Sequence, residues 1–130
     1  MQSSPPSRNC RDLKRVLLVE NPSHDRDRHT GVLTRNHFDL EISDDIAAAR
    51  AAWQPQTYGL VLVSLDGFGD DAARFCEEAR DNDPDQLIAM IFHPDQELPS
   101  MQCPTLIFTT EPDEYFLARV RTLTEMAYAA

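Results

Sequence analysis

The sequence predicts an α/β fold, a three-layer α/β/α sandwich in which helices cover both faces of a five-stranded parallel sheet. Four short runs of apolar residues, each of strand length, alternate along the chain with segments that favour helix. Such runs are typical of strands that are buried on both faces. Because 130 residues suffice for one core of this kind and not for two, we expect a single domain over residues 14–130.

The expected strands differ in their hydropathy patterns. Four are apolar nearly throughout and cover residues 15–20, 60–63, 87–92 and 105–109. Between the first and second of these, Phe38, Leu40 and Ile42 alternate with polar residues, which is the period of a strand with one face in water. This strand is therefore expected at an edge of the sheet, as the second strand is in the flavodoxin-like order 2-1-3-4-5.

Two helices are expected in the first half of the chain. Asn21 and Pro22 favour a helix start, since an Asn side chain can cap free amides and Pro is tolerated in the first turn. His29, Val32, Leu33 and Asn36 then fall at i, i+3, i+4 and i+7, the spacing of one helix face, and the helix is weakly amphipathic. The alanine-rich residues 46–53 predict a second helix.

Two further helices are expected in the second half. Asp70 and Asp71 are in position to cap a third helix, and the last helix is expected over residues 114–127. Residues 93–103 contain two prolines and few apolar residues. Because proline breaks helices, we expect the fourth helix of this fold to be short or missing.

Composition narrows the class of partner. Acidic residues outnumber basic residues by 22 to 12, so the net charge of −10 repels phosphate backbones and anionic membranes. We expect no nucleic acid and no membrane as partner, and no apolar run approaches the ~20 residues that cross a bilayer. Three widely spaced cysteines and an opening without a charged-then-apolar leader favour a cytoplasmic location. Residues 1–13 have no apolar period and are expected to be a disordered tail.

Polar residues follow two strands that adjoin in the expected sheet. Glu20 and Asn21 follow the first strand, and Ser64 and Asp66 follow the third. Because the carboxyl ends of these strands meet where such sheets bind ligands, we expect the four residues to surround one crevice. Carboxylate oxygens suit a hard cation, so Glu20 and Asp66 are a weak candidate for a metal site.

Residues 15–22, 58–69 and 111–121 make the chain resemble the receiver domain of two-component response regulators, the CheY-like superfamily. The resemblance implies an acidic pair that holds Mg²⁺ after the first strand and a phosphorylated aspartate at the end of the third. It also implies a Ser or Thr after the fourth strand and a Lys before a Pro after the fifth. Hydroxyl and lysine groups would stabilise the phosphoryl charge.

The chain departs from the family's phosphorylation site. Glu20 keeps one acid of the metal-binding pair, but Asn21 replaces the other. Ser64 occupies the position of the phosphoacceptor, and either Ile91 or Phe92 occupies that of the switch hydroxyl. The resemblance therefore indicates a degenerate acceptor and a depleted metal site.

The family's lysine is also replaced. Glu111 stands at its position, directly before Pro112, and reverses the charge that would neutralise a phosphoryl group. The only lysine in the chain is Lys14, at the opposite end of the first strand. Phe108 matches the family's aromatic switch residue, although an aromatic residue in a strand is also explained by core packing.

We interpret the chain as a pseudo-receiver that acts in bacterial signal transduction through phosphorylation-independent protein–protein interaction. The expected partner is a histidine kinase, a response regulator or an output protein, and a homodimer is possible. We expect no enzyme activity and no cofactor. The alternative is a phospho-accepting receiver of a phosphorelay that uses Asp66, and a small-molecule sensor that uses the crevice is left open.

The remaining reactive side chains have simpler interpretations. A nucleophilic Ser64 would need a base, for which His93 is the candidate, but no nucleophile-elbow glycines flank the serine. His24 and His29 do not share a helix face and are both interpreted as solvated surface residues. Cys76 is expected to be buried in helix packing.

Overall fold

The computed structural model describes residues 12–66, 68–93, 95, 106–108 and 111–129, without the side chains of 106–108 and 126–129. The strands are β1 (Asp12–Val19), β2 (Asp39–Ser43), β3 (Tyr58–Ser64), β4 (Ile88–Phe92) and β5 (Leu106–Phe108). The helices in this part of the chain are α1 (His24–Arg35), α2 (Ile46–Ala52), α3 (Asp70–Asn82) and α4 (Asp113–Ala129). Strands and helices alternate in the described residues as the sequence predicts, and most of the segment between β4 and β5 lies outside those residues.

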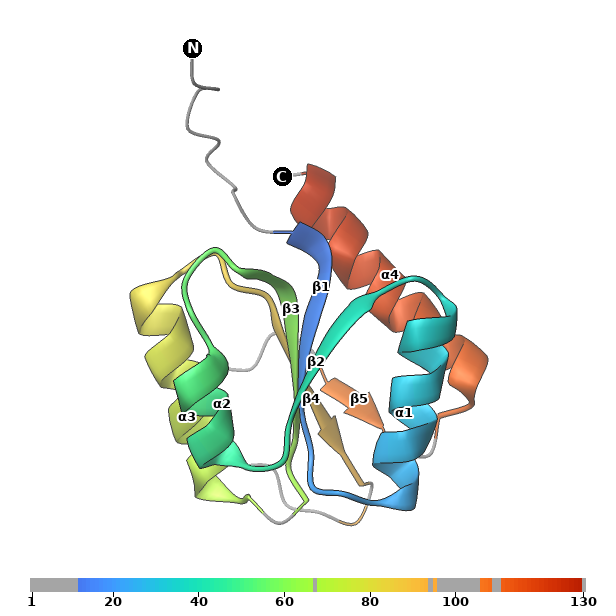
Figure 1. Cartoon of the computed structure of the whole chain (residues 1–130), viewed down its shortest axis with the longest axis horizontal. Helices are drawn as coiled ribbons and strands as arrows, with labels where there is room; N and C mark the ends of the chain where they lie inside the picture. Colours follow the sequence, from blue (N-terminus) through green and yellow to red (C-terminus); the bar gives the residue numbers. More distant parts are fainter. Residues whose placement is uncertain (1–11, 67, 94, 96–105, 109–110, 130) are drawn as a thin grey trace.

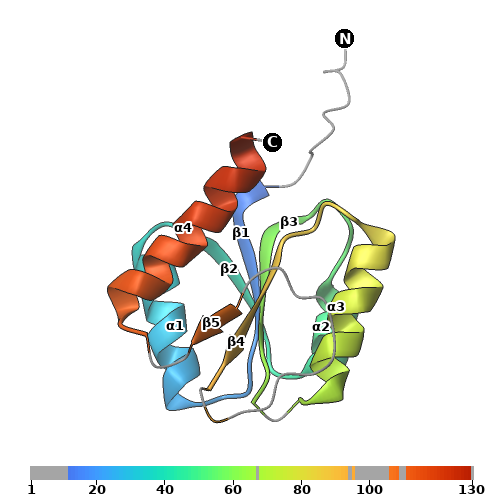
Figure 2. The same ribbon diagram turned by 180° about the vertical axis from the view of Figure 1, so that it is seen from behind.

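The five strands form one parallel sheet in the order β2-β1-β3-β4-β5, which confirms the predicted topology. Strand β3 lies at the centre, and each of its seven residues is buried. Strand β2 lies at an edge and leaves Ile42 exposed. Helices α2 and α3 cover one face of the sheet, and α1 and α4 cover the other (Figures 1 and 2).

Successive residues of the central strands point to opposite faces and build two cores. Leu17 and Val19 pack with the residues of α2 and α3, whereas Val16 and Leu18 pack with those of α1 and α4. Burying each such side chain contributes about 1.5–3 kcal/mol before the entropy of ordering is subtracted. The uniformly apolar runs exist because both sides of the sheet are covered.

Strand β1 begins earlier than predicted. Asp12 and Leu13 were assigned to the disordered tail, but both belong to β1, and Asp12 pairs with Tyr58 across an irregular register. The backbone of Leu13 lies so close to Gly59 that a Cβ on the glycine would be 2.6 Å from the Leu13 Cα. The missing side chain at position 59 permits this approach, which the polar sequence of the first residues does not reveal.

Two predicted helix caps were wrong. The N-cap of α1 is Ser23, whose side chain accepts a hydrogen bond from the Arg26 backbone N–H, and not Asn21. The N-cap of α3 is Gly69, with a φ of 55°, and it makes no side-chain cap. Asp70 and Asp71 lie inside the first turn, where their negative charges interact favourably with the positive end of the helix dipole.

The prediction that the family's fourth helix is short or missing falls mainly on residues 96–105, which lie outside the described residues. Helix α4 is the last helix that the sequence predicts, and its residues Phe116, Val120 and Leu123 are buried. Among the described residues, no helix is long and apolar enough to span a membrane.

Candidate functional site

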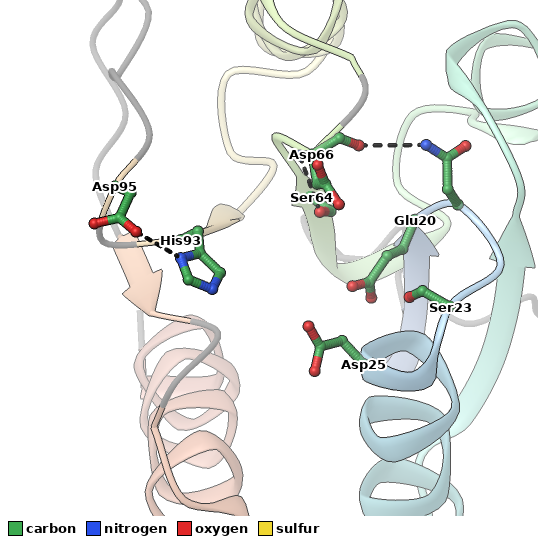
Figure 3. A pocket seen from close by; sticks show the side chains of 8 residues that line it. Glu20, Ser23, Asp25, Ser64, Asp66, His93 and Asp95 are labelled. Carbon is green, nitrogen blue, oxygen red and sulfur yellow. Dashed lines mark hydrogen bonds and ion pairs between the residues drawn. The ribbon is translucent and has the colours of Figure 1, made fainter.

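A cavity of about 250 Å³ opens where β1 and β3 end (Figure 3). Strand register places it there, because Val19 pairs with Val63 and Ser64 pairs with Ile91. Loops that leave neighbouring parallel strands at one edge therefore converge. The cavity is lined by Glu20, Asn21, Ser23, Asp25, Ser64, Asp66, His93 and Asp95. The four residues that the sequence predicts at one crevice are thus brought together.

Ser64, at the degenerate acceptor position, is the last residue of β3 and is 1% exposed. Its Oγ accepts a hydrogen bond of 3.2 Å from the backbone N–H of Asp66. The serine hydroxyl therefore stabilises the turn that leaves the sheet, a local role that Ser side chains commonly fill. A hydroxyl without an activating base is a weak nucleophile.

Asp66, the alternative acceptor, is tied by its backbone while the residue as a whole is exposed. Its carbonyl oxygen accepts a hydrogen bond of 3.3 Å from Asn21 Nδ2. This bond joins the loop after β1 to the loop after β3 (Figure 3). Asn21 therefore connects the two walls of the cavity.

Glu20 is the most buried of the acidic residues that line the cavity. Its Oε1 lies 3.0 Å from His29 Nδ1, and the side chains are only 5% and 2% exposed. Because a carboxylate only accepts hydrogen bonds, Nδ1 carries the proton in this pair. The imidazole ring also stacks on Phe116 of α4, with ring centroids 4.6 Å apart. The interpretation of His29 as a solvated surface residue was therefore wrong.

The first turn of α1 adds residues that the sequence analysis did not assign to the site. Ser23 and Asp25 line the cavity. Arg26 donates a hydrogen bond of 3.3 Å to the Glu20 carbonyl oxygen and forms an ion pair with Asp44. The signal in the sequence was Ser-His-Asp-Arg, which begins three residues after the predicted first strand, where a helix start at Ser23 brings that turn to the strand end.

The two residues that the sequence predicts at the switch-hydroxyl position, Ile91 and Phe92, are apolar. Ile91 and Phe92 are both buried in the core, so neither offers a hydroxyl to the cavity. His93 follows them, is exposed and lines the cavity, and its Nδ1 lies 3.9 Å from Asp95 Oδ2. Phe108 lies in β5 and pairs with Phe92, but its side chain is outside the described part of the structure.

The carboxylate of Glu111 is bound by an arginine of helix α4. Its oxygens lie 3.0 and 2.9 Å from Arg119 Nε, which donates to both from the second turn of α4. Lys14 lies near the opposite end of the sheet, with its Nζ 4.6 Å from the centre of the Phe38 ring. No lysine can therefore replace the family's residue at the strand ends.

The residues present do not fit the Mg²⁺ that receiver domains imply. Within the described ranges, no three His, Cys, Asp or Glu side chains are grouped so that they could hold a metal ion. Glu20 is engaged by His29, and an amide and a hydroxyl stand at Asn21 and Ser64. Hard cations prefer several free carboxylate oxygens, which this arrangement does not provide.

No protein-family model and no curated protein matches the sequence. Solved structures do. A CheY-like response regulator receiver domain protein from Methanospirillum hungatei matches with a TM-score of 0.76 and 15% identity over 91% of this chain and 98% of that one. The response regulator TrrA from Thermotoga maritima, in complex with Mg²⁺-BeF, matches with a TM-score of 0.69 and 16% identity over 84% of this chain and 97% of that one. A structure of TrrA in complex with the histidine kinase ThkA matches with a TM-score of 0.68 and 16% identity, again over 84% of this chain and 97% of that one. The chain therefore has the fold of CheY-like response-regulator receiver domains.

Proposed function

We propose that the chain is a pseudo-receiver, which takes part in two-component signalling by binding a protein partner without being phosphorylated. The observation that carries this proposal is Ser64. A buried serine, hydrogen-bonded to its own loop, stands where the third strand of a receiver presents its acceptor aspartate. Phosphorylation of an aspartate carboxylate gives an acyl phosphate. A serine hydroxyl has no carboxylate and cannot form one.

The groups that would support phosphoryl transfer are replaced or already engaged. Glu20 is bound by His29, and Glu111 by Arg119. Ile91 and Phe92 contribute apolar packing in place of a hydroxyl. Because transfer depends on metal, hydroxyl and lysine together, a single displaced aspartate would not restore it.

A protein is the partner class that the comparison supports best. TrrA, which shares this fold, has been solved bound to a histidine kinase. The net charge of −10 disfavours nucleic acid. We infer a cytoplasmic binding module whose partner is a kinase, a response regulator or an output protein, and not an enzyme.

The test measures binding with and without a phosphoryl mimic. Purified histidine kinases and response regulators encoded beside the gene are titrated against the chain, with Mg²⁺ and beryllofluoride present or absent. We expect at least one to bind with an unchanged Kd, also for Asp66→Asn and for the control Asp71→Asn. Binding that requires beryllofluoride and is lost only in Asp66→Asn would overturn the proposal, as would no binding at all.

Asp66 sustains the second candidate function, a phospho-accepting receiver. The residue is exposed and lines the cavity two positions after Ser64. Its backbone, bound by Asn21 and Ser64, holds it at the mouth of the site. An exposed carboxylate there is accessible to a phosphodonor, and the intact mass of the chain after incubation with Mg²⁺ and acetyl phosphate separates this function from the first.

A further inference from the structure

His29 is a buried polar residue for which the pseudo-receiver function supplies no role. It lies in α1, is 1% exposed and meets Glu20, the innermost acid of the cavity. We propose that His29 is a built-in substitute for the divalent cation: its imidazole occupies the Glu20 carboxylate and keeps such cations out of the crevice. This inference rests on the proposed function and explains how the metal site is closed.

The contact between the two side chains is strong enough to compete with a cation. The Nδ1 to Oε1 distance of 3.0 Å is that of a hydrogen bond, and both side chains are almost fully withdrawn from water. Hydrogen bonds to a charged acceptor are stronger than those between neutral groups. A cation that binds Glu20 must displace the imidazole and leave its N–H buried without a partner.

The imidazole is also fixed in position. It stacks on Phe116 with an angle of 30° between the rings, so a rotation of the imidazole away from Glu20 would also break this ring contact. Arg26 approaches the same residue from another side, through the Glu20 carbonyl oxygen. Two cationic or hydrogen-donating side chains of α1 are therefore directed at Glu20.

The other charged groups near His29 do not free Glu20. Arg28 lies between Asp25 of its own helix, at 3.8 Å, and Asp113 of α4, at 3.3 Å. The acids that remain around the cavity are Asp25, Asp66 and Asp95, and the last two are exposed. Carboxylates in water hold cations weakly because their charge is solvated and screened. The deep ligand of a receiver metal site is thus the one that His29 occupies.

The experiment uses Mn²⁺ as the probe, with binding followed by electron paramagnetic resonance and folding by circular dichroism. His29→Leu keeps an apolar contact with Phe116 and removes the donor, so we expect about tenfold tighter Mn²⁺ binding or more. His29→Asn keeps a donor near the Nδ1 position and should stay closer to the wild type. His24→Leu, which removes an exposed histidine from the same helix, is the matched control and should change nothing.

The double variant Glu20→Gln/His29→Leu assigns the gain to the carboxylate and should abolish it. A folded His29→Leu chain that binds Mn²⁺ no more tightly than the wild type would overturn the proposal. If the variant does not fold, paramagnetic broadening in the wild-type chain decides. We expect the amide signals of Glu20 and Asn21 to persist at Mn²⁺ concentrations that broaden receiver domains, and their selective loss would contradict the inference. Both readouts are independent of phosphorylation, so they separate this inference from the proposed function.

Discussion

Arg119 Nε donates to both oxygens of Glu111, at 3.0 and 2.9 Å, so the residue that the sequence predicts at the position of the receiver lysine is bound to helix α4. The arginine side chain is half-exposed, whereas the glutamate is 14% exposed. Solvent therefore screens much of the attraction between the two charges. The pair fixes the direction of Glu111 more than it stabilises the fold.

We predict that Glu111→Gln lowers the free energy of unfolding by about 1 kcal/mol or less, because one partner of the pair is largely in water. Urea unfolding measures this change. Asp71→Asn is the control, since its contact with Arg74 is 3.8 Å long and exposed on both sides, and only the helix-dipole contribution of about 0.3–1 kcal/mol should be lost there. A loss of about 3 kcal/mol or more in Glu111→Gln would indicate a buried pair and contradict the prediction.

The two glycines at positions 59 and 31 predict opposite results for substitution by alanine. At Gly59 a Cβ would meet the Leu13 backbone at 2.6 to 2.8 Å, so Gly59→Ala should destabilise the chain by about 1–3 kcal/mol through a shift of β1. At Gly31 the nearest atom is the mobile end of Arg35, at 2.9 Å. Gly31→Ala should therefore stabilise α1 by about 0.5–1 kcal/mol.

Thermal unfolding of the two glycine variants beside the wild type measures these effects. Equal melting temperatures for Gly59→Ala and the wild type would show that the start of β1 does not press on β3. A lower melting temperature for Gly31→Ala would show that Arg35 cannot move aside.

Tyr58 predicts a loss of stability in alkali. Burial, together with the hydrogen bond of its hydroxyl to Glu41 at 2.8 Å and the charge of that residue, raises the pKa of Tyr58 from 10.0 to about 12. In the unfolded chain the phenol ionises first, so the folded state binds more protons between these pH values. The stability that Tyr58 contributes is complete below pH 10 and is lost as the pH rises to about 12.

Urea unfolding across the alkaline range measures this dependence. The slope of stability against pH should become shallower in Tyr58→Phe, because the titrating group is gone. Tyr115→Phe, at an exposed position, is the control and should keep the wild-type slope. Identical slopes in the wild type and Tyr58→Phe would contradict the raised pKa.

Much of the fold could be predicted from the sequence because each strand that is covered on both faces must be apolar along its length. Residues 60–63 show this pattern, and β2 lies at the edge that its alternation predicts. Its predicted division into an apolar and a wet face was wrong at the end of the strand, where Ile42 is exposed and Ser43 is buried. The exact ends of the helices and strands were harder to predict from the sequence. Ser23 rather than Asn21 caps α1, since both residue types accept amide hydrogen bonds and only the path of the chain decides between them.

The candidate site was predicted in position but not in its internal contacts. Strand order alone places Glu20 beside Ser64, so the crevice follows from the topology. The helical spacing places His29 on the same face of α1 as Val32 and Leu33, and all three are buried. The contact of His29 with Phe116, far along the chain, could not be predicted. Long-range contacts of this kind leave no periodic signal in a sequence.

The central claim, that the receiver site is not phosphorylated, is tested most directly by intact mass. The chain is incubated with Mg²⁺ and acetyl phosphate and weighed whole, beside a working receiver domain as positive control and Asp66→Asn as the variant. We predict that the wild type and Asp66→Asn both keep their unmodified mass while the control gains a phosphoryl group. A phosphoryl group that is gained by the wild type and absent from Asp66→Asn would contradict the claim and establish Asp66 as the acceptor.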